Sequence, residues 1–328
     1  MNATVQPDFS ISLALFGAYM VEGLLLVICD GLLAATIIYH EALSDQKEYL
    51  VFAALAFADS ICGFGTFSAG LHRLSQLLTN TAIVPTSRRS CVLRVHSLAF
   101  IFASPCAALM LLVVSLDRFF MVTWSLEYIS WTHKYAWSLV GTTYSFCTVQ
   151  FLVSVYRSLQ STAEDVTSFC IVAEALLPID YSLINSVMTY SSLSSIAVYF
   201  AMLAAHKKSM NLSVNAVTEA SKKRKLQRQR KLTKTVGVSC VCTLIFYALP
   251  TSAMKIAFWM EYPYHRNLTA WCWLLANINP MLNLFIFLLK QKEINVGLLA
   301  MVKGKKLPSD LNAWNLGNSN VVHPQRNT

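Results

Sequence analysis

Residues 92–122 have the sequence VLRVHSLAFIFASPCAALMLLVVSLDRFFMV, an apolar run that ends in an adjacent acid and base, Asp117 and Arg118. Arg118 is the only lysine or arginine between Arg94 and Lys134. A charge at a membrane boundary is energetically costly, and an acid-base pair kept there usually has a function. Whether this run crosses a bilayer therefore decides how the whole chain is interpreted.

The composition places the chain in a membrane. Only 13% of its 328 residues are charged and 55% are hydrophobic, whereas a soluble protein carries about 25% charged residues. A helix that spans a bilayer needs about 20 mostly apolar residues. Seven segments meet this requirement: 12–39, 49–71, 92–122, 135–156, 176–205, 233–258 and 268–289. We therefore expect an all-α membrane protein with a seven-transmembrane helix bundle at residues 12–290, preceded by residues 1–11 and followed by a tail at 291–328.

The positions of lysine and arginine predict the orientation, because cytosolic loops carry an excess of them. The segment 206–234 holds ten, and residues 290–306 add five more. We therefore expect an extracellular N-terminus and a cytosolic C-terminus, although Arg73, Arg88 and Arg89 then lie outside, against the rule. The first apolar segment has no preceding positive charge and is too long for a signal peptide, so it is expected to remain as an anchor helix.

Two further expectations follow from this orientation. The sequon Asn2-Ala-Thr4 lies outside, where Asn2 can be glycosylated, and Asn211-Leu-Ser213 lies inside, where Asn211 cannot. The basic inner surface lies beside an anionic leaflet, which accounts for most of the net charge of +9, and contact with a signalling protein can hold alongside it. No nucleic-acid partner is expected.

Two cysteines are placed to form a disulfide. Cys91 begins the third span and Cys170 lies in the loop between the fourth and fifth spans, both on the outer side. An oxidising exterior favours their pairing, which would hold the loop over the helix bundle as a lid. Cys272, at the outer edge of the seventh span, is the one rival.

Proline interrupts three of the expected spans. Pro250 lies in the sixth, Pro280 in the seventh directly after Asn279, and Pro105 in the third. Proline frees a carbonyl and bends a helix. Kinks in the sixth and seventh spans suit a signal transmitter, because their inner ends can swing while the outer ends move little. Kinks used only for packing are the alternative.

Charged residues within the spans indicate candidate sites, because charges are rare in lipid. They are Glu22, Asp30, Asp59 and Lys255. We expect Asp59 to face the bundle interior, where Asn279, Asn283 or a sodium ion satisfies it. A purely structural hydrogen-bond hub around Asp30 and Asp59 is the alternative. No other cofactor and no resident metal is expected.

The outer half of the bundle contains mixed aromatic and polar residues that suit a ligand pocket. No acid lies between Cys91 and Asp117 to pair with a protonated amine, so amine ligands are not expected. Each candidate also fits a packing role. The candidate pocket residues are His96, Phe100, Ser104, Glu174, Lys255 and Trp273.

Together these residues resemble the rhodopsin-like family of G-protein-coupled receptors over nearly the whole chain. Asp117-Arg118-Phe119 is similar to the family's Asp-Arg-Tyr triplet, and the segment from Asn279 and Pro280 to Asn283 is similar to Asn-Pro-x-x-Tyr, with Asn283 in place of tyrosine. Asp59 and Pro250 also match the family pattern, and Asp30 falls near its first-span asparagine. The departures are Ala248 in place of the sixth-span tryptophan, the lack of a central tryptophan in the fourth span and of a central proline in the fifth, and the lack of an acid near Arg230. This divergent pattern resembles the nematode serpentine chemoreceptors.

The resemblance implies a mechanism. A small-molecule or peptide ligand would shift a two-state equilibrium, and the sixth span would pivot near Pro250 so that Arg118 meets a Gα subunit. Tyr199 is a candidate to stabilise Arg118 in that state, and Asp117 is its nearest resting partner. Without an acid near Arg230 we expect loose restraint of Arg118 and measurable basal activity.

The resemblance also implies partners and a location. A heterotrimeric G protein, arrestin and membrane lipids are the expected partners, at the plasma membrane and in a sensory cilium. Residues 291–302 are expected to form an amphipathic eighth helix whose apolar face, Ile294, Leu298 and Met301, lies on the inner leaflet.

Two other function classes remain as alternatives. A proton- or ion-coupled transporter could use Glu22, Asp30 and Asp59 as a path. A membrane enzyme would need clustered metal ligands or a nucleophile with a base. The histidines in the spans or at their ends are instead scattered: His40, His72, His96, His133, His206 and His265.

Overall fold

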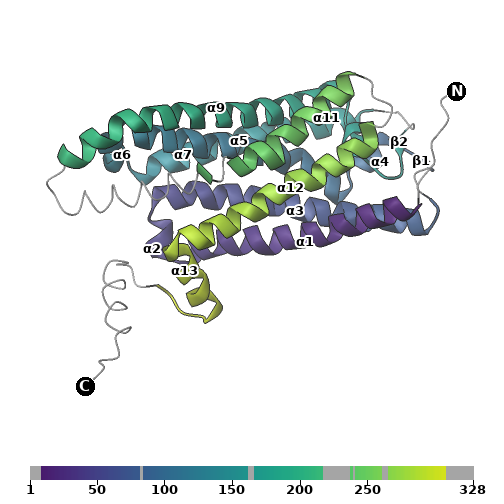
Figure 1. Cartoon of the computed structure of the whole chain (residues 1–328). Coiled ribbons are helices and arrows are strands. Elements are labelled where there is room, and N and C mark those ends of the chain that lie inside the picture. The colour runs from purple at the N-terminus through teal and green to yellow at the C-terminus, as the bar shows by residue number, and fades with distance from the viewer. Residues whose placement is uncertain are drawn as a thin grey trace.

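The computed structural model describes residues 9–81, 84–161, 166–216, 237–238, 241–260 and 265–307. Asn2 and Arg230 lie outside these ranges. In the described part the chain forms a bundle of long, roughly aligned helices with short elements at each end (Figure 1). The long helices are α1(Phe9–Tyr39), α3(Lys47–Leu78), α5(Val95–Thr123), α7(His133–Leu159), α9(Pro178–Ala216), α11(Leu249–Trp259) with the π-helix η1(Leu244–Ala248) before it, and α12(His265–Lys290).

Short elements close the two ends of the bundle. At one end lie α4(Arg88–Val92), α8(Val172–Ala175) and an antiparallel pair of strands, β1(Pro85–Thr86) with β2(Val166–Thr167). At the other end lie α2(Glu41–Ser44), α6(Ser125–Ser130) and α13(Lys292–Val302). The first is called the disulfide end below and the second the Arg118 end. The chain enters α1 at the disulfide end and leaves α12 at the Arg118 end (Figure 1).

The long helices lie where the apolar segments predict spans. Among the described residues, α1, α3, α5, α7 and Leu268–Lys290 of α12 are long and apolar enough to cross a membrane, and Val241–Ala257 forms a shorter apolar helix. The longer helix α9 carries Ser191, Ser192 and Ser195, all buried, and the Ser195 and Ser115 hydroxyls are hydrogen-bonded at 2.7 Å. Polar bonds of this kind hold helices together where lipid supplies no hydrophobic drive.

Small residues allow α1 and α3 to pack closely. A Cβ built on Gly63 would lie 2.6 Å from Leu26 Cβ and 2.9 Å from Val27 N, and one built on Gly23 would overlap the Phe67 backbone. Only glycine permits this approach, since a closer contact than about 3 Å forces a shift of the backbone. The α1–α3 pair forms the side of the bundle on which α5, α12 and α13 rest.

The irregularity expected at Pro250 takes the form of a π-helical turn. Residues Leu244–Ala248 are π-helical directly before Leu249 and Pro250. Proline has no N–H for the preceding turn, and the Thr251 hydroxyl donates to the Tyr247 and Ala248 carbonyls at 2.8 and 3.2 Å. By contrast, α12 continues as a helix through Pro280.

The eighth helix is present as α13, but its apolar face contacts the bundle rather than lipid. Ile294 is 1% exposed and belongs to the core cluster formed with α1 and α3. His40 Nε2 donates to the Gly297 carbonyl at 2.8 Å, while His40 Nδ1 accepts from the Leu307 amide at 3.2 Å. The inner-leaflet contact expected for Ile294 is therefore wrong. The apolar side chains that face outward are Leu299 and Val302.

Candidate functional site

Arg118 is completely buried at its end of the bundle. Its Nε donates to Asp117 Oδ2 at 3.0 Å, and its Nη2 donates to the same oxygen. The side chain is 0% exposed. A buried arginine requires a paired carboxylate, because an unpaired charge without water is strongly unfavourable. The expected pairing of Arg118 with Asp117 is confirmed.

A tyrosine from α6 completes this ion pair. The Tyr128 hydroxyl donates to Asp117 Oδ1 at 2.8 Å and accepts from Arg118 Nη2 at 3.2 Å. Burial raises the pKa of the Tyr128 phenol, so it stays protonated and remains a donor. The expectation that Arg118 is loosely restrained is wrong for this conformation, because Tyr128 supplies a restraint that nothing in the Asp117-Arg118-Phe119 motif reveals.

Lys47 at the start of α3 holds α6 in place. Its Nζ donates to the backbone carbonyls of Tyr128 and Trp131, the second at 3.0 Å, and lies 3.9 Å from the centre of the Tyr128 ring. The rings of Trp131 and Tyr135 pack at 4.7 Å. We call Arg118, Asp117, Tyr128 and Lys47 the arginine lock. It ties α3, α5 and α6 together.

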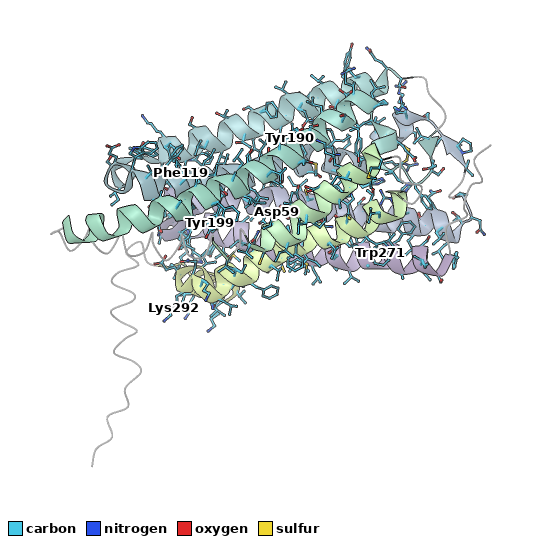
Figure 2. All side chains as sticks on the ribbon, turned by 45° about the horizontal axis from the view of Figure 1, so that its top comes forward. Asp59, Phe119, Tyr190, Tyr199, Trp271 and Lys292 are labelled. Carbon is cyan, nitrogen blue, oxygen red and sulfur yellow. A yellow bond between two sulfur atoms is a disulfide. The ribbon has the colours of Figure 1, made fainter. Side chains whose placement is uncertain are left out.

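Tyr199 of α9 packs in the apolar cluster around the arginine lock. It is buried with Met121, Tyr128 and Met202. A Cβ on Gly237 would collide with the Tyr199 hydroxyl. Phe119, Tyr199 and Lys292 lie toward the same end of the bundle, far from Trp271, with Asp59 between (Figure 2).

The middle of the bundle holds a set of buried polar residues. Asp30 and Asp59 are 2% and 7% exposed and lie close enough to repel each other when both are ionised. Within the described part of the chain, Asp30 Oδ2 has no hydrogen-bond partner. Asn279 Oδ1 accepts from the Thr243 hydroxyl at 3.1 Å, which links α12 to the turn before η1. Asn283 is also buried.

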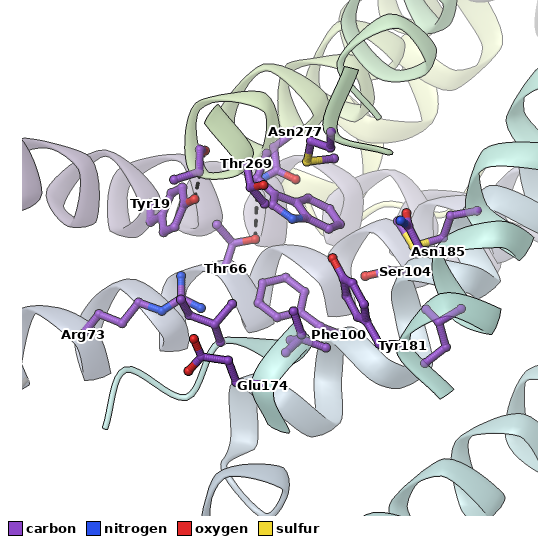
Figure 3. Close-up of a pocket in the computed structure, with 18 residues that line it drawn as sticks. Tyr19, Thr66, Arg73, Phe100, Ser104, Glu174, Tyr181, Asn185, Thr269 and Asn277 are labelled. Carbon is purple, nitrogen blue, oxygen red and sulfur yellow. Dashed lines mark hydrogen bonds between the residues drawn. The ribbon is translucent and has the colours of Figure 1, made fainter. Parts of the chain in front are cut away.

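A cavity of about 330 Å³ lies among the helices toward the disulfide end (Figure 3). Four of the six expected pocket residues line it: Phe100, Ser104, Glu174 and Trp273. Other lining residues were not expected as pocket residues from the sequence. They include Tyr19, Thr66, Arg73, Tyr181, Asn185 and Asn277.

The other two expected pocket residues face elsewhere. His96 donates to the Cys170 carbonyl at 3.3 Å and stacks on His72 at 5.2 Å. Lys255 lies 4.4 Å from the Tyr190 ring and 3.5 Å from the Ser186 hydroxyl. Neither lines the cavity. A sequence gives the depth of a residue in its span but leaves the rotation of the helix open, and rotation decides these two positions.

Polar bonds between helices surround the cavity. Asn277 of α12 donates to Glu22 Oε2 at 3.2 Å and to the Thr66 hydroxyl at 3.4 Å, which joins α1, α3 and α12. The Tyr19 hydroxyl donates to the Ala270 carbonyl at 2.9 Å (Figure 3). Glu22, expected as a charge within a span, is thus bonded inside the bundle.

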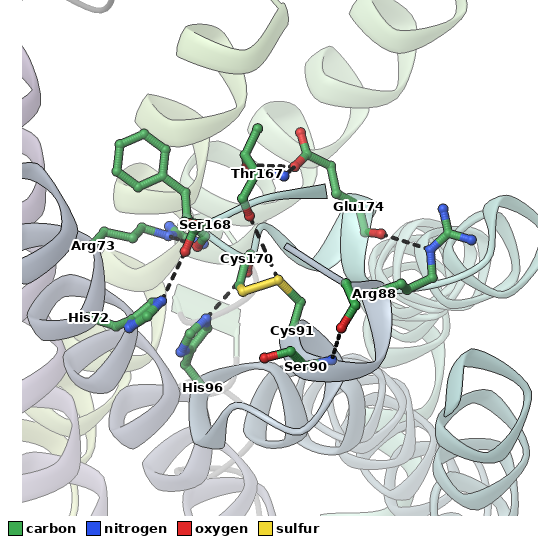
Figure 4. The surroundings of a disulfide bond; sticks show 12 residues. His72, Arg73, Arg88, Ser90, Cys91, His96, Thr167, Ser168, Cys170 and Glu174 are labelled. Atoms are coloured by element: carbon green, nitrogen blue, oxygen red, sulfur yellow. Dashed lines mark hydrogen bonds between the residues drawn. A yellow bond between two sulfur atoms is a disulfide. The ribbon is translucent and has the colours of Figure 1, made fainter. Parts of the chain in front are cut away.

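The loop that contains Cys170 covers the cavity. Cys91 and Cys170 form the expected disulfide, and residues 171–174 line the cavity directly after it. Three basic side chains hold three successive carbonyls of this loop: His72 bonds Ser168, Arg73 bonds Phe169 and His96 bonds Cys170, at 3.0, 3.3 and 3.3 Å (Figure 4). The predicted lid is confirmed, and it is held by more than its disulfide.

The lidded cavity and the arginine lock lie at opposite ends of one helical bundle, an arrangement that suits a membrane receptor. No curated protein matches the chain. Residues 12–298 match the family model described as serpentine type 7TM GPCR chemoreceptor Srsx. The chain therefore belongs to the Srsx family of serpentine seven-transmembrane chemoreceptors.

Proposed function

We propose that this protein is a chemosensory receptor of the plasma membrane that binds a small ligand in the lidded cavity and activates a heterotrimeric G protein through Arg118. The observation that carries this proposal is the buried arginine lock, placed at the opposite end of the bundle from the cavity. An arginine whose charge is paired and whose N–H groups are hydrogen-bonded at one end of the bundle can exchange these contacts for contacts with another protein.

Movement of the later helices would connect the two ends. The cavity is lined by Tyr181 and Met188 of α9, Met254 of α11 and Trp273 of α12. A ligand that contacts α9, α11 and α12 together can favour one arrangement of these helices over another, which is the requirement for a population shift. The π-helical turn at Leu244–Ala248 would act as the hinge, because it interrupts the regular α-helix and such turns occur frequently at functional sites.

In the active arrangement, Arg118 would leave Asp117 and Tyr128 and bind the carboxyl end of a Gα subunit, with Tyr199 as its support. The N-terminus is then extracellular and the basic segment at 206–234 cytosolic. Arrestin would use the same inner surface. Leu299, Val302 and the lysines near them would contact membrane lipids.

We further propose a sodium ion at Asp59 and Asp30. Two buried carboxylates that repel each other when both are ionised favour a cation or a shared proton, and Asp30 Oδ2 has a free acceptor position among the described residues. A cation there would stabilise the resting arrangement.

The test is nucleotide exchange on a panel of Gα subunits co-expressed with the receptor. We expect exchange with at least one subunit, and we expect Arg118→Ala to abolish it. Arg94→Ala is the matched control, because Arg94 lies just before the same helix, α5, and is exposed at the other end. Exchange that is absent with every subunit, or that survives Arg118→Ala, contradicts the proposal.

A further inference from the structure

Among the described residues that line the cavity, one has a cationic side chain, Arg73, on the α3 side near the disulfide end (Figure 3). Arg73 Nε donates to the Phe169 carbonyl at 3.3 Å, and the guanidinium lies 5.8 Å from the centre of the Tyr19 ring. These two contacts fix the direction of the side chain. They use only one of its five N–H donors.

Beyond that bond, the guanidinium forms no hydrogen bond or ion pair within the described part of the chain, although the charge of Glu174 acts on it. The two ion pairs found there, Arg118–Asp117 and Arg157–Asp180, do not involve it. Its terminal amino groups donate no hydrogen bond to any described residue. A cation in a site with little water favours an anionic acceptor, and two parallel terminal amino groups match the two oxygens of a carboxylate.

The carboxylate whose charge acts on Arg73, Glu174, is held by another group. Its Oε2 accepts from the Thr167 amide and hydroxyl at 3.2 and 2.7 Å, which turns it toward β2 (Figure 4). Its backbone carbonyl accepts from Arg88 at 3.2 Å. Glu174 therefore lines the cavity without forming an ion pair with Arg73.

The remainder of the cavity suits an apolar body. The rings of Phe100 and Trp273 lie 6.0 Å apart and tilted by 35°, and Ile184, Met188 and Met254 complete an apolar wall. Such a cavity, mostly apolar with a few placed polar groups, is typical of small-ligand sites, and about 330 Å³ is near the lower end of their size.

We propose that the ligand of this receptor is a small carboxylate, whose anionic group binds the terminal amino groups of Arg73 while its apolar body lies against Phe100 and Trp273. The inference rests on the proposed ligand-binding function of the cavity. It commits to an anionic class, in contrast to a neutral odorant or an amine.

Direct binding to the purified full-length receptor in lipid nanodiscs tests this inference. The probes are phenylacetate, cinnamate, octanoate and decanoate, each compared with its primary amide, which has nearly the same shape without the charge. We expect at least one acid to bind on the order of tenfold to a hundredfold more tightly than its amide, as a hydrogen bond to a charged group implies.

Variants then assign the preference to Arg73. Arg73→Gln should remove the preference for acid over amide, and Arg73→Lys should keep part of it. Arg94→Gln, which removes an exposed arginine at the same end outside the cavity lining, should leave it unchanged. Equal binding of acids and amides to the wild type, absence of binding by every acid, or a preference that survives Arg73→Gln overturns the inference.

The comparison of acids with amides uses only the wild type, so it tests the proposed ligand class even if Arg73→Gln does not fold. No G protein is present in this experiment. If acids bind through Arg73 but no Gα subunit exchanges nucleotide, the proposed coupling fails and the ligand class stands. If nucleotide exchange depends on Arg118 but the receptor binds acids and amides equally, the proposed coupling stands and the ligand class is wrong.

Discussion

Arg118 shows how a charge is kept inside a membrane protein. Its guanidinium donates hydrogen bonds to Asp117 and to the Tyr128 hydroxyl, and Asp117 accepts hydrogen bonds from both Arg118 and Tyr128. The three groups satisfy one another, so removal of any one leaves a buried polar group unpaired, at about 1–3 kcal/mol or more. This conformation of Arg118 is therefore specified by residues from two different elements, α5 and α6.

Tyr128→Phe should raise basal activity. The change removes the bond to Asp117 and an acceptor for Arg118 without removing the ring, which destabilises the resting state by about 1–2 kcal/mol and raises the active fraction on the order of tenfold. Basal nucleotide exchange, normalised to receptor at the cell surface, measures it.

Tyr135→Phe is the control for this change. Tyr135 packs in the same aromatic cluster, but its buried hydroxyl has no hydrogen-bond partner in the described ranges. It should leave basal exchange unchanged. Equal exchange by wild type and Tyr128→Phe would show that Tyr128 does not restrain Arg118.

At the scale of elements, the helices meet through small residues and local irregularities. The glycines of α1 and α3 allow two backbones to touch, and the π-helical turn before Pro250 interrupts the regular helix where α11 begins. The helix α13 packs its apolar side on α1 and α3 through Ile294, so it belongs to the bundle.

Gly23→Ala should destabilise the bundle by about 1–3 kcal/mol, because its new Cβ would overlap the Phe67 backbone. Gly17→Ala lies on the same helix, with no atom within 4 Å of the new Cβ, and should be neutral or slightly stabilising. Thermal unfolding of the purified receptor in one detergent compares them. A similar midpoint for both variants would contradict close α1–α3 packing.

At the scale of the molecule, the two ends are stabilised differently. The disulfide end combines a covalent bond with three bonds to successive loop carbonyls. The Arg118 end is held by an ion pair and hydrogen bonds, which can be exchanged for bonds to a partner. In the proposed orientation, this asymmetry suits a receptor whose outer lid stays in place while its inner end rearranges.

Cys91→Ser should loosen the lid and lower stability. The bond closes a sequence separation of 79 residues, and loss of such a link typically costs about 2–4 kcal/mol. Cys272→Ser is the control, since Cys272 is a buried free thiol at the same end. Hydrogen exchange of residues 166–175, with thermal unfolding, follows the effect. Equal protection in both variants would show that the bonds to the loop carbonyls suffice without the disulfide.

The proposed orientation predicts which sequon is modified. Asn2→Gln should remove a glycosidase-sensitive shift in gel mobility, whereas Asn211→Gln should not change mobility, because Asn211 then lies in the cytosol. A shift that depends on Asn211 would reverse the orientation, and with it the assignment of Arg118 to the cytosolic side.

Several features could be predicted from the sequence because they depend on local properties. Seven apolar runs predict the seven-transmembrane class, since span length is read directly along the chain. The Asp117–Arg118 pair follows from adjacency, and the Cys91–Cys170 bond from the scarcity of cysteines in the outer loops. None of these requires knowledge of how a helix is rotated.

What the sequence by itself determined is therefore the membrane class, the covalent link of the lid and the partner nearest to Arg118. Only the tertiary structure decided that Tyr128 completes the arginine lock, that Arg73 rather than His96 or Lys255 faces the cavity, and that Ile294 faces protein. The physical reason is that helix rotation and loop docking depend on packing between segments distant in the chain. The apolar runs are nearly uniform around each helix, so they do not encode this packing.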